Sequence, residues 1–443
     1  MSLRRLSALV GCGLALLALT GAGLLAQRRH ETNAFLAVAL AQGAVYLAAL
    51  ALLRRSPASR RDVAFVLGIA AAMRVAVAVT PPYLSTDVYR YVWDGRVIAA
   101  GINPYRYIPA DPHLAALRDP AIFPNINRRN YAHTIYPPAA EVIFFAVTRL
   151  GAGVTAMKAA MVGFEAIAVA LLLRLLVLSG QPPSRIAIYA WHPLPLWEFA
   201  GSGHIDAAIV ALVALALWCR RRASGWPTGL ALVGGTLVKF DPAAIFPSLW
   251  QRWDWRMPAV FCLTMIAAYL PFIGVGWGVF GFLPHYMGEE GFAGGGAGLY
   301  LWDIAKAILP LRGIADATYL AGAAALGSAL AGFVALRRHG PDADVRGAAL
   351  LAGAFMLLLS PHYPWYFAWL LVFACLAPSA ALVWLTLASF LLYLLPVWPQ
   401  LMRSRPWLLV QSILYVPFLA LAAAEWWRHH QREQAKHGER LSR

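Results

Sequence analysis

The sequence carries little charge for its length. Only 13% of its 443 residues are Asp, Glu, Lys or Arg, whereas 60% are hydrophobic. A soluble globular chain has about 25% charged residues. This shortage excludes an ordinary soluble enzyme, and we expect the excess apolar residues to face lipid.

Cysteine is scarce as well. Each of the four cysteines lies inside an apolar stretch, and none is spaced as part of a pair: they are Cys12, Cys219, Cys262 and Cys375. A disulfide framework or a structural zinc site needs recurring, closely spaced cysteines. The sequence therefore predicts neither, and we interpret all four as small core residues.

Long apolar runs are abundant. A membrane-spanning helix needs about 20 mostly apolar residues, and such runs recur from residue 6 to residue 427. The first run follows Arg4 and Arg5, which favours an uncleaved signal anchor over a cleaved signal peptide. We predict an all-α, polytopic membrane helix bundle with about twelve spans and additional re-entrant half-helices. Residues 1–430 are expected to form one domain and residues 431–443 a basic cytoplasmic tail.

The arginines predict how these spans are oriented. The net charge of +16 arises in short segments between apolar runs, as the positive-inside rule produces, so no nucleic-acid partner is indicated. Arg4, Arg5 and the arginines of residues 54–61 place both ends of the first helical hairpin in the cytoplasm. The third span then runs outward. Residues 81–137 are therefore expected to form an external loop of an inner (plasma) membrane protein.

The middle of the chain contains breaks as well as spans. We predict crossings at residues 139–152, 154–179 and 206–218, the last being the only full crossing between residues 180 and 220. Prolines interrupt residues 186–200, which indicates a re-entrant or kinked helix. Residues 226–250 are expected to form a hairpin of two half-spans, and residues 281–299 an external glycine-rich loop.

The external loop begins with a short polar helix. At helical spacing Asp87, Arg90, Tyr91 and Asp94 share one face, which concentrates two carboxylates, a guanidinium and a phenol. A capping aspartate and a solvated ion pair would explain the same pattern without any chemistry. The aromatic residues that follow, Tyr105 and Tyr136, suit either sugar binding or the aromatic belt at a membrane surface.

These residues resemble a known family. Asp87-Val88-Tyr89-Arg90-Tyr91-Val92-Trp93-Asp94-Gly95, Gly101-Ile102-Asn103-Pro104-Tyr105 and Tyr136-Pro137-Pro138 are similar to the first-loop signature of bacterial polyprenyl-phosphate-sugar-dependent glycosyltransferases of the C superfamily. The pattern of alpha-mannosyltransferases and their relatives is the most similar. The resemblance continues in the short motifs around His192, His204, Lys239 and His362. His192 and Ile205 depart from the family pattern, which leaves the donor and acceptor open.

The resemblance implies a function. It suggests transfer of a hexose, mannose by the nearest pattern, from a polyprenyl-phosphate donor to a glycolipid, glycan or protein acceptor. Transfer would occur with inversion at the non-cytoplasmic face, in contact with membrane lipid. Asp87 matches the family's catalytic aspartate and is expected to act as general base, with Asp94 as the second candidate. The expected substrate-binding residues are Arg90, Tyr91, Tyr105, Arg106, Tyr136, His204, Asp206, Lys239 and His362.

Simpler explanations exist for several of these residues. Lys239 would also be satisfied by an ion pair with Asp241, because an unpaired lysine is costly inside a bilayer. No cofactor is required; a divalent metal could be bound by Asp87, Asp94 and His204, although no spacing calls for one. A transporter or flippase of a lipid-linked glycan remains the alternative function, and an envelope scaffold a third. Transport needs no long loop with acidic, aromatic and basic residues, and a scaffold would tolerate substitution of Asp87.

Overall fold

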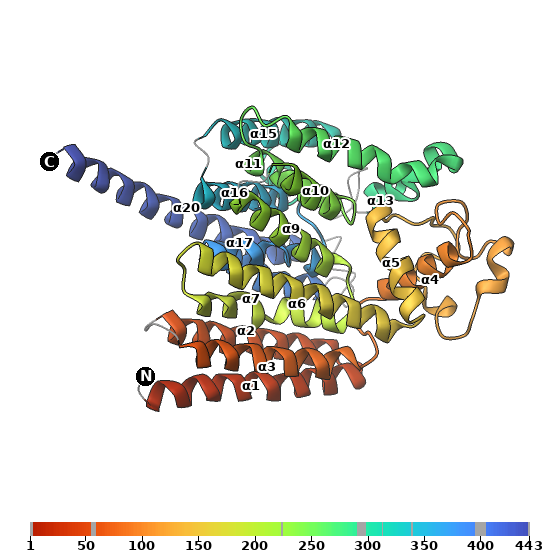
Figure 1. Ribbon diagram of the computed structural model, residues 1–443, viewed down its shortest axis with the longest axis horizontal. Coiled ribbons are helices and arrows are strands. Elements are labelled where there is room, and N and C mark those ends of the chain that lie inside the picture. The colour runs from red at the N-terminus through yellow and green to blue at the C-terminus, as the bar shows by residue number, and fades with distance from the viewer. Residues whose placement is uncertain are drawn as a thin grey trace.

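The computed structural model describes residues 3–54, 59–222, 225–289, 298–311, 313–337, 340–394 and 405–441. This part of the chain is helical and contains no strand. Most helices lie side by side along the long axis, and both termini lie at the same end of the bundle (Figure 1). The predicted all-α membrane bundle is confirmed, since six described helices are long and apolar enough to cross a membrane. The number of spans stays a prediction.

The longer helices are α1 (Leu3–Arg28), α2 (Thr32–Arg54), α3 (Arg60–Ala78), α4 (Asp87–Ala99), α5 (Pro138–Leu150), α6 (Val154–Leu178), α9 (Asp206–Arg221), α10 (Gly225–Thr236), α12 (Arg256–Tyr269), α15 (Asp316–Leu336), α16 (Pro341–Leu359) and α20 (Arg405–Leu441). Shorter helices are α7 (Ala187–Ala190), α8 (Pro193–Pro195), α11 (Phe246–Leu249), α13 (Leu283–Glu289), α14 (Tyr300–Ile308), α17 (Leu370–Leu376) and α18 (Ala380–Ala388). Short 3-10 segments are η1 (Pro112–Leu117), η2 (Phe123–Asn125), η3 (Pro183–Ile186), η5 (Asp241–Ile245), η6 (Leu270–Phe280), η7 (Pro364–Phe367) and η8 (Ser389–Tyr393), and η4 (Leu196–Gly201) is a π-helix.

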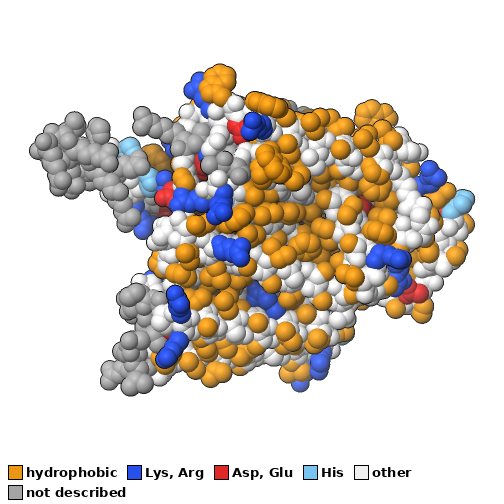
Figure 2. Space-filling model, viewed as in Figure 1, with side chains coloured by type: hydrophobic (Ala, Val, Ile, Leu, Met, Phe, Trp, Pro, Cys, Tyr) orange, Lys and Arg blue, Asp and Glu red, His pale blue; other side chains and the backbone are white. Residues whose placement is uncertain are grey.

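The two ends of the bundle differ in character. We call the end that carries residues 81–137 the loop end. The opposite end, at which α2 and α9 terminate, is called the arginine end. In Figure 1 the loop end lies to the right, with α4, α5 and α13, and the termini lie to the left. Hydrophobic side chains cover much of the middle of the face shown in Figure 2, as expected of a surface in contact with lipid.

Helix α5 corrects one predicted crossing. It has 13 residues and stays at the loop end, packed against α4. The Ala139 amide at its start donates to the Leu237 carbonyl (3.0 Å), and beyond its end Arg96 of α4 donates to the Ala152 carbonyl (2.6 Å). Its start is thus bonded to Leu237 and its end lies beside α4. Because both ends stay at the loop end, residues 139–152 do not cross the bundle.

A second correction compensates for the first. The sequence predicts one full crossing between residues 180 and 220, but the segment before α9 also runs from end to end. Arg185 donates to the Leu376 carbonyl at the arginine end (3.4 Å), and His204 lies 3.9 Å from Asp87 at the loop end. Because one crossing is lost at α5 and one is gained here, α9 still finishes at the arginine end.

The gained crossing is the predicted kinked helix. It passes through η3, α7, α8 and the π-helix η4, with Pro193 and Pro195 at the break. Residues 186–211 are all buried. Irregular backbone at membrane depth is tolerated where protein rather than lipid surrounds it, and a π-helix often marks a functional site.

Residues 226–250 form the predicted hairpin. Helix α10 runs beside α9, and Lys239 beyond its end contacts Asp206 at the start of α9. The chain returns through η5 and α11, so that Met257 packs against Gly229 near the start of α10. The tip of this hairpin therefore delivers Lys239 to the loop end.

Several charged side chains inside the bundle have polar partners. Arg74 of α3 pairs with Glu165 of α6 (2.9 Å). Lys158 donates to the Val77 carbonyl (3.2 Å), and Glu198 accepts from Tyr393 (2.6 Å). Such pairing is what a low-dielectric interior demands, since an isolated charge there is very costly.

Two further predictions differ in detail from the structure. The predicted glycine-rich loop at 281–299 contains α13, and residues 290–297 of it lie outside the described residues. Helix α20 extends to Leu441, and the cytoplasmic location of the tail at 431–443 stays a prediction. Cys262 is exposed on α12 and is not a core residue, whereas Cys219 and Cys375 are buried.

Candidate active site

Helix α4 carries the first set of candidate residues and is fixed tightly to α5. Ser85 accepts a hydrogen bond from the Asp87 amide (3.2 Å), which positions the first turn. A Cβ on Gly95 would lie 2.4 Å from the Phe144 carbonyl oxygen of α5, so only glycine permits this approach. Val88, Val92 and Trp93 are buried. The apolar faces of α4 therefore rest on protein, and its polar face is held rigidly.

The predicted ion pair on the polar face of α4 exists and is buried. Arg90 donates to both carboxylate oxygens of Asp94 at 2.8 Å and also to the Ala132 carbonyl (3.1 Å). Asp94 is 1% exposed. Arg90 is therefore largely committed to Asp94 and to the loop backbone, and Asp94 does not line the pocket described next.

A pocket of about 580 Å³ opens beside α4 at the loop end. Its walls come from α4, the loop before α5, the start of α9, the hairpin tip, α13 and η7. Six of the predicted site residues line it: Asp87, Arg90, Tyr91, Tyr136, Asp206 and Lys239. Segments separated by up to 280 residues of sequence thus meet at one cavity.

Two carboxylates line the pocket, and Asp87 is the one that no described lysine or arginine contacts directly. Its Oδ1 accepts from the side-chain amide of Asn127 (2.6 Å), and the Asp87 side chain is 21% exposed. Burial raises the pKa of Asp87, whereas the Asn127 hydrogen bond and the charges of Arg128 and Lys239 act to lower it. An accessible carboxylate with a raised pKa is suited to take a proton near neutral pH.

Two cations approach the same pocket. Lys239 pairs with Asp206 (3.0 Å) and stands over the ring of Tyr366, 3.4 Å from its centroid. Arg128 pairs with Glu289 of α13 (2.6 Å). Each keeps part of its side chain exposed, 18% for Lys239 and 28% for Arg128. Partly exposed cations facing a cavity can bind phosphate oxygens.

Aromatic rings form another wall of the pocket. Trp365 stacks on Tyr363 at 4.5 Å, and the hydroxyl groups of Tyr286 and Tyr366 lie 3.0 Å apart. Helix α13, which carries Tyr286, begins beside the loop because the Phe282 amide donates to the Thr134 carbonyl (3.2 Å). Only glycine at position 281 permits this approach, since a Cβ there would overlap the Thr134 carbonyl oxygen. Rings with hydroxyl groups at their edges suit the apolar faces and hydroxyls of a sugar.

Three buried polar side chains, His204, Glu198 and Tyr393, follow one another inward from Asp87. His204 Nδ1 is 3.9 Å from Asp87, and His204 Nε2 is 3.4 Å from Glu198, which accepts from Tyr393. The His204 ring stacks on Trp365 at 4.0 Å and is fully buried. Neither ring nitrogen of His204 makes a hydrogen bond within the described residues, and His204 does not line the cavity.

Three other predicted residues lie away from the pocket. Tyr105 is buried and donates to the Tyr136 carbonyl (2.7 Å), which braces the loop. Arg106 is exposed and does not line the pocket. The Nε2 atom of His362 lies 3.2 Å from the Gly298 carbonyl oxygen, and His362 does not line the pocket. The motif around His362 contributes its aromatic neighbours Trp365 and Tyr366 to the pocket instead.

Sequence reasoning missed Asn127 and Arg128. They follow Asp87 by about 40 residues in an irregular loop, so no helical or strand period connects them to it. Arg128 has a positive φ of 51°, which turns the chain at this point. The only signal was the polar run Asn127-Arg128-Arg129-Asn130 within an aromatic loop.

The three candidate metal ligands are not brought together. Asp94 is engaged by Arg90, while His204 lies behind Asp87. Among the residues described by the structure, no group of three or more His, Cys, Asp or Glu side chains could hold a metal ion.

Comparison with known proteins supplies an independent finding. A family model described as alpha-(1->6)-mannopyranosyltransferase, N-terminal domain, matches residues 5–254, which is more than half of the chain. The matched region includes α4, the loop with Asn127 and Arg128, and the hairpin tip with Lys239. No curated protein matches the chain.

Proposed function

Because the chain belongs to the alpha-(1->6)-mannopyranosyltransferase family, we propose that it transfers mannose from a polyprenyl-phosphate donor to a glycan or glycolipid acceptor. The observation that carries this proposal is the pocket in which Asp87 faces Arg128, Lys239 and an aromatic wall. A carboxylate base, cations and sugar-binding rings are the groups that such a transfer needs.

Asp87 acts as general base in this proposal. The acceptor hydroxyl gives its proton to Asp87 as its oxygen bonds to the anomeric carbon, while the bond from that carbon to the donor phosphate breaks. Because the acceptor oxygen attacks the face of the anomeric carbon opposite the departing phosphate in one displacement, the configuration at that carbon is inverted. The other carboxylate in the pocket, Asp206, is neutralised by Lys239 and is a poorer base.

Lys239 and Arg128 are assigned to the donor phosphate. The leaving phosphate gains negative charge as the bond breaks, and fixed cations stabilise that charge more in the transition state than in the ground state. The pocket lies at the end of a bundle, and hydrophobic side chains cover much of the face of that bundle shown in Figure 2. A lipid-linked donor can therefore keep its chain in the bilayer while its head group enters the pocket. We place this face on the non-cytoplasmic side of the inner membrane.

The donor assignment is tested with purified full-length protein in liposomes. Polyprenyl-phosphate mannose, polyprenyl-phosphate glucose and a nucleotide-linked mannose are each supplied with a synthetic alpha-mannoside acceptor. We expect transfer from the lipid-linked mannose only, with an inverted anomeric centre in the product. Transfer from the nucleotide sugar would refute the donor assignment, and retention of configuration would refute the single-base mechanism. A lack of turnover with every lipid-linked donor would favour transport.

Asn127→Ala is expected to displace the acidic limb of the pH-rate profile. The Asn127 amide stabilises ionised Asp87, so its loss raises the pKa of Asp87 further. The base is then protonated at a higher pH, and activity on the acidic side falls. A charged hydrogen bond of about 1.5 kcal/mol corresponds to roughly one pH unit. The measurement is kcat/KM against pH.

Asn125→Ala is the matched control for this shift. Asn125 is in the same loop and exposed, and it donates to the Ala121 carbonyl rather than to the pocket. Its profile should coincide with that of the natural protein. An unchanged acidic limb in Asn127→Ala would mean that Asp87 is not the group that titrates.

A further inference from the structure

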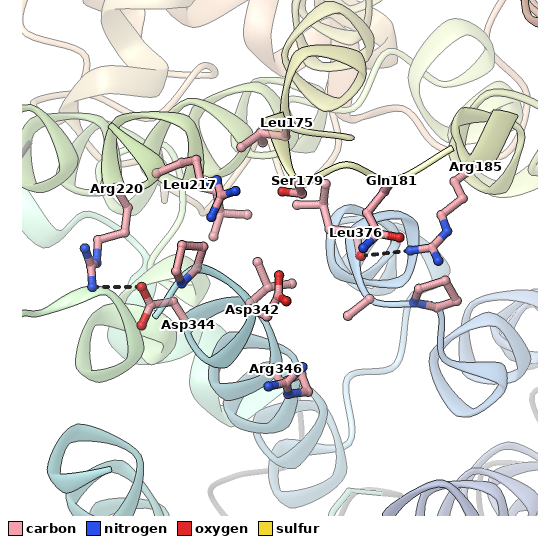
Figure 3. Close-up of a pocket in the computed structure, with 15 residues that line it drawn as sticks. Leu175, Ser179, Gln181, Arg185, Leu217, Arg220, Asp342, Asp344, Arg346 and Leu376 are labelled. Atoms are coloured by element: carbon pink, nitrogen blue, oxygen red, sulfur yellow. Dashed lines mark hydrogen bonds and ion pairs between the residues drawn. The ribbon is translucent and has the colours of Figure 1, made fainter. Parts of the chain in front are cut away.

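A second pocket lies at the arginine end, far from Asp87 (Figure 3). It measures about 750 Å³, including space open to solvent, and is formed where α6 and α9 finish, α16 begins and α17 ends. Its charged lining consists of Arg185, Arg220, Arg221, Arg346, Asp342 and Asp344. The pocket therefore carries an excess of positive charge.

Most of this positive charge is not neutralised within the protein. Arg220 pairs with Asp344 (2.8 Å), as the dashed line in Figure 3 shows. In the described part of the chain, no ion pair is made by Arg185, Arg221 or Arg346. Arg185 and Arg221 instead donate to carbonyl groups, of Leu376 (3.4 Å) and Leu178 (2.8 Å). Asp342 alone opposes these three guanidinium groups, so the cavity favours an anion.

An apolar groove continues from this pocket. It lies between α15, α16, α18 and α20 and shares Asp344, Arg346, Ala377 and Pro378 with the pocket. Leu350, Leu382, Phe418 and Leu419 are among its apolar lining, and it encloses about 2930 Å³ open to the surface. Arg54, Arg337 and Arg428 also line it, together with one further carboxylate, Glu425, which accepts from the Ser379 hydroxyl (2.8 Å) and the Ala380 amide (2.5 Å). Arg54 ends α2 and Arg337 follows the last residue of α15, whereas Arg428 lies within α20.

We propose that this pocket and groove bind an anionic phospholipid. The phosphate of its head group would lie among Arg185, Arg221 and Arg346, and its acyl chains would lie along α16 and α20. Guanidinium groups form strong hydrogen bonds with phosphate oxygens. Basic pockets between membrane helices bind anionic head groups, and a long apolar groove has no use for a small soluble anion. The charge and shape together favour a lipid with net negative charge.

The test measures lipid binding to the full-length protein by native mass spectrometry from detergent. Phosphatidylglycerol and phosphatidylcholine of equal chain length are titrated separately. We expect phosphatidylglycerol to bind at least tenfold more tightly, because each arginine near the head group favours the anion. Arg185→Gln/Arg346→Gln should reduce that preference roughly tenfold while phosphatidylcholine binding stays unchanged.

Arg61→Gln/Arg222→Gln provides the matched control. Both arginines are exposed near the arginine end, and neither lines the pocket or the groove. This double variant loses the same charge and should keep the full preference for phosphatidylglycerol. An equal loss in the control, or equal binding of the two lipids by the natural protein, would overturn the proposal. Short-chain phosphatidylglycerol or inorganic phosphate binding as tightly as the long-chain lipid would refute the role of the groove.

Discussion

Asp87→Asn is expected to reduce sugar transfer by about 10²-fold to 10⁴-fold, the usual contribution of a general base. The side chain keeps its shape, and its carbonyl oxygen can still accept from Asn127, but it cannot take the acceptor's proton. Insertion and thermal unfolding should stay close to those of the natural protein. Initial rates of transfer from polyprenyl-phosphate mannose, together with a melting curve, check both statements.

Asp111→Asn is the matched control for that substitution. Asp111 lies in the same loop, outside the pocket, and caps η1 by accepting from the His113 amide. Asparagine can perform the same capping, so activity should change by less than about twofold. If Asp87→Asn kept a tenth or more of the natural rate, Asp87 would not be the base. Loss of folding in that variant would show that the carboxylate is needed for structure.

Lys239→Met is expected to lower kcat/KM by about 10²-fold, since it removes a cation from the developing phosphate charge. The sequence left two roles open for Lys239, namely contact with a ligand and an ion pair with Asp241. The structure places its ammonium group against Asp206 and over the ring of Tyr366 instead. Lys239 therefore has two candidate roles, to stabilise the donor phosphate or only to neutralise Asp206. Variants of Asp206 distinguish these roles.

Asp206→Asn and the double variant Lys239→Met/Asp206→Asn complete the cycle. If Lys239 stabilises the phosphate, Asp206→Asn should keep most of the activity, because the cation remains, and the double variant should be as impaired as Lys239→Met. If Lys239 serves only to neutralise Asp206, the two single variants should be equally impaired. The double variant would then recover activity. Rates measured under identical conditions decide between these patterns.

The accuracy of the sequence predictions depended on how local the interaction was. The contact between Arg90 and Asp94 follows from helical spacing, since residues four apart share a face. Proline spacing similarly predicted the break before α9. The failures at α5 arose because apolar composition does not distinguish a helix that crosses lipid from one buried against protein at the loop end. In the folded protein α5 stays beside α4 at the loop end, and Gly95 permits the close approach of these two helices.

In the candidate site, too, local sequence patterns identified individual residues but did not predict which of them lie together. Asp87 and Lys239 each stand in recognisable motifs, but nothing local relates them to each other. Asn127, Arg128 and Tyr286 reach the pocket through an irregular loop and a short helix, whose paths depend on contacts distant in sequence. Tyr105 and His362 also stand in motifs, yet packing turns them to bracing roles.

The sequence by itself determined that this chain is a helical membrane protein with a polar, carboxylate-bearing loop, because composition and helical period are properties of neighbouring residues. Only the tertiary structure decided which charges remain accessible. Arg90 and Asp94 form a buried ion pair with each other, whereas Asp87 and Lys239 both line one cavity. Such outcomes depend on which side chains a folded bundle brings within a few ångströms, and that distance is set by packing across the whole chain.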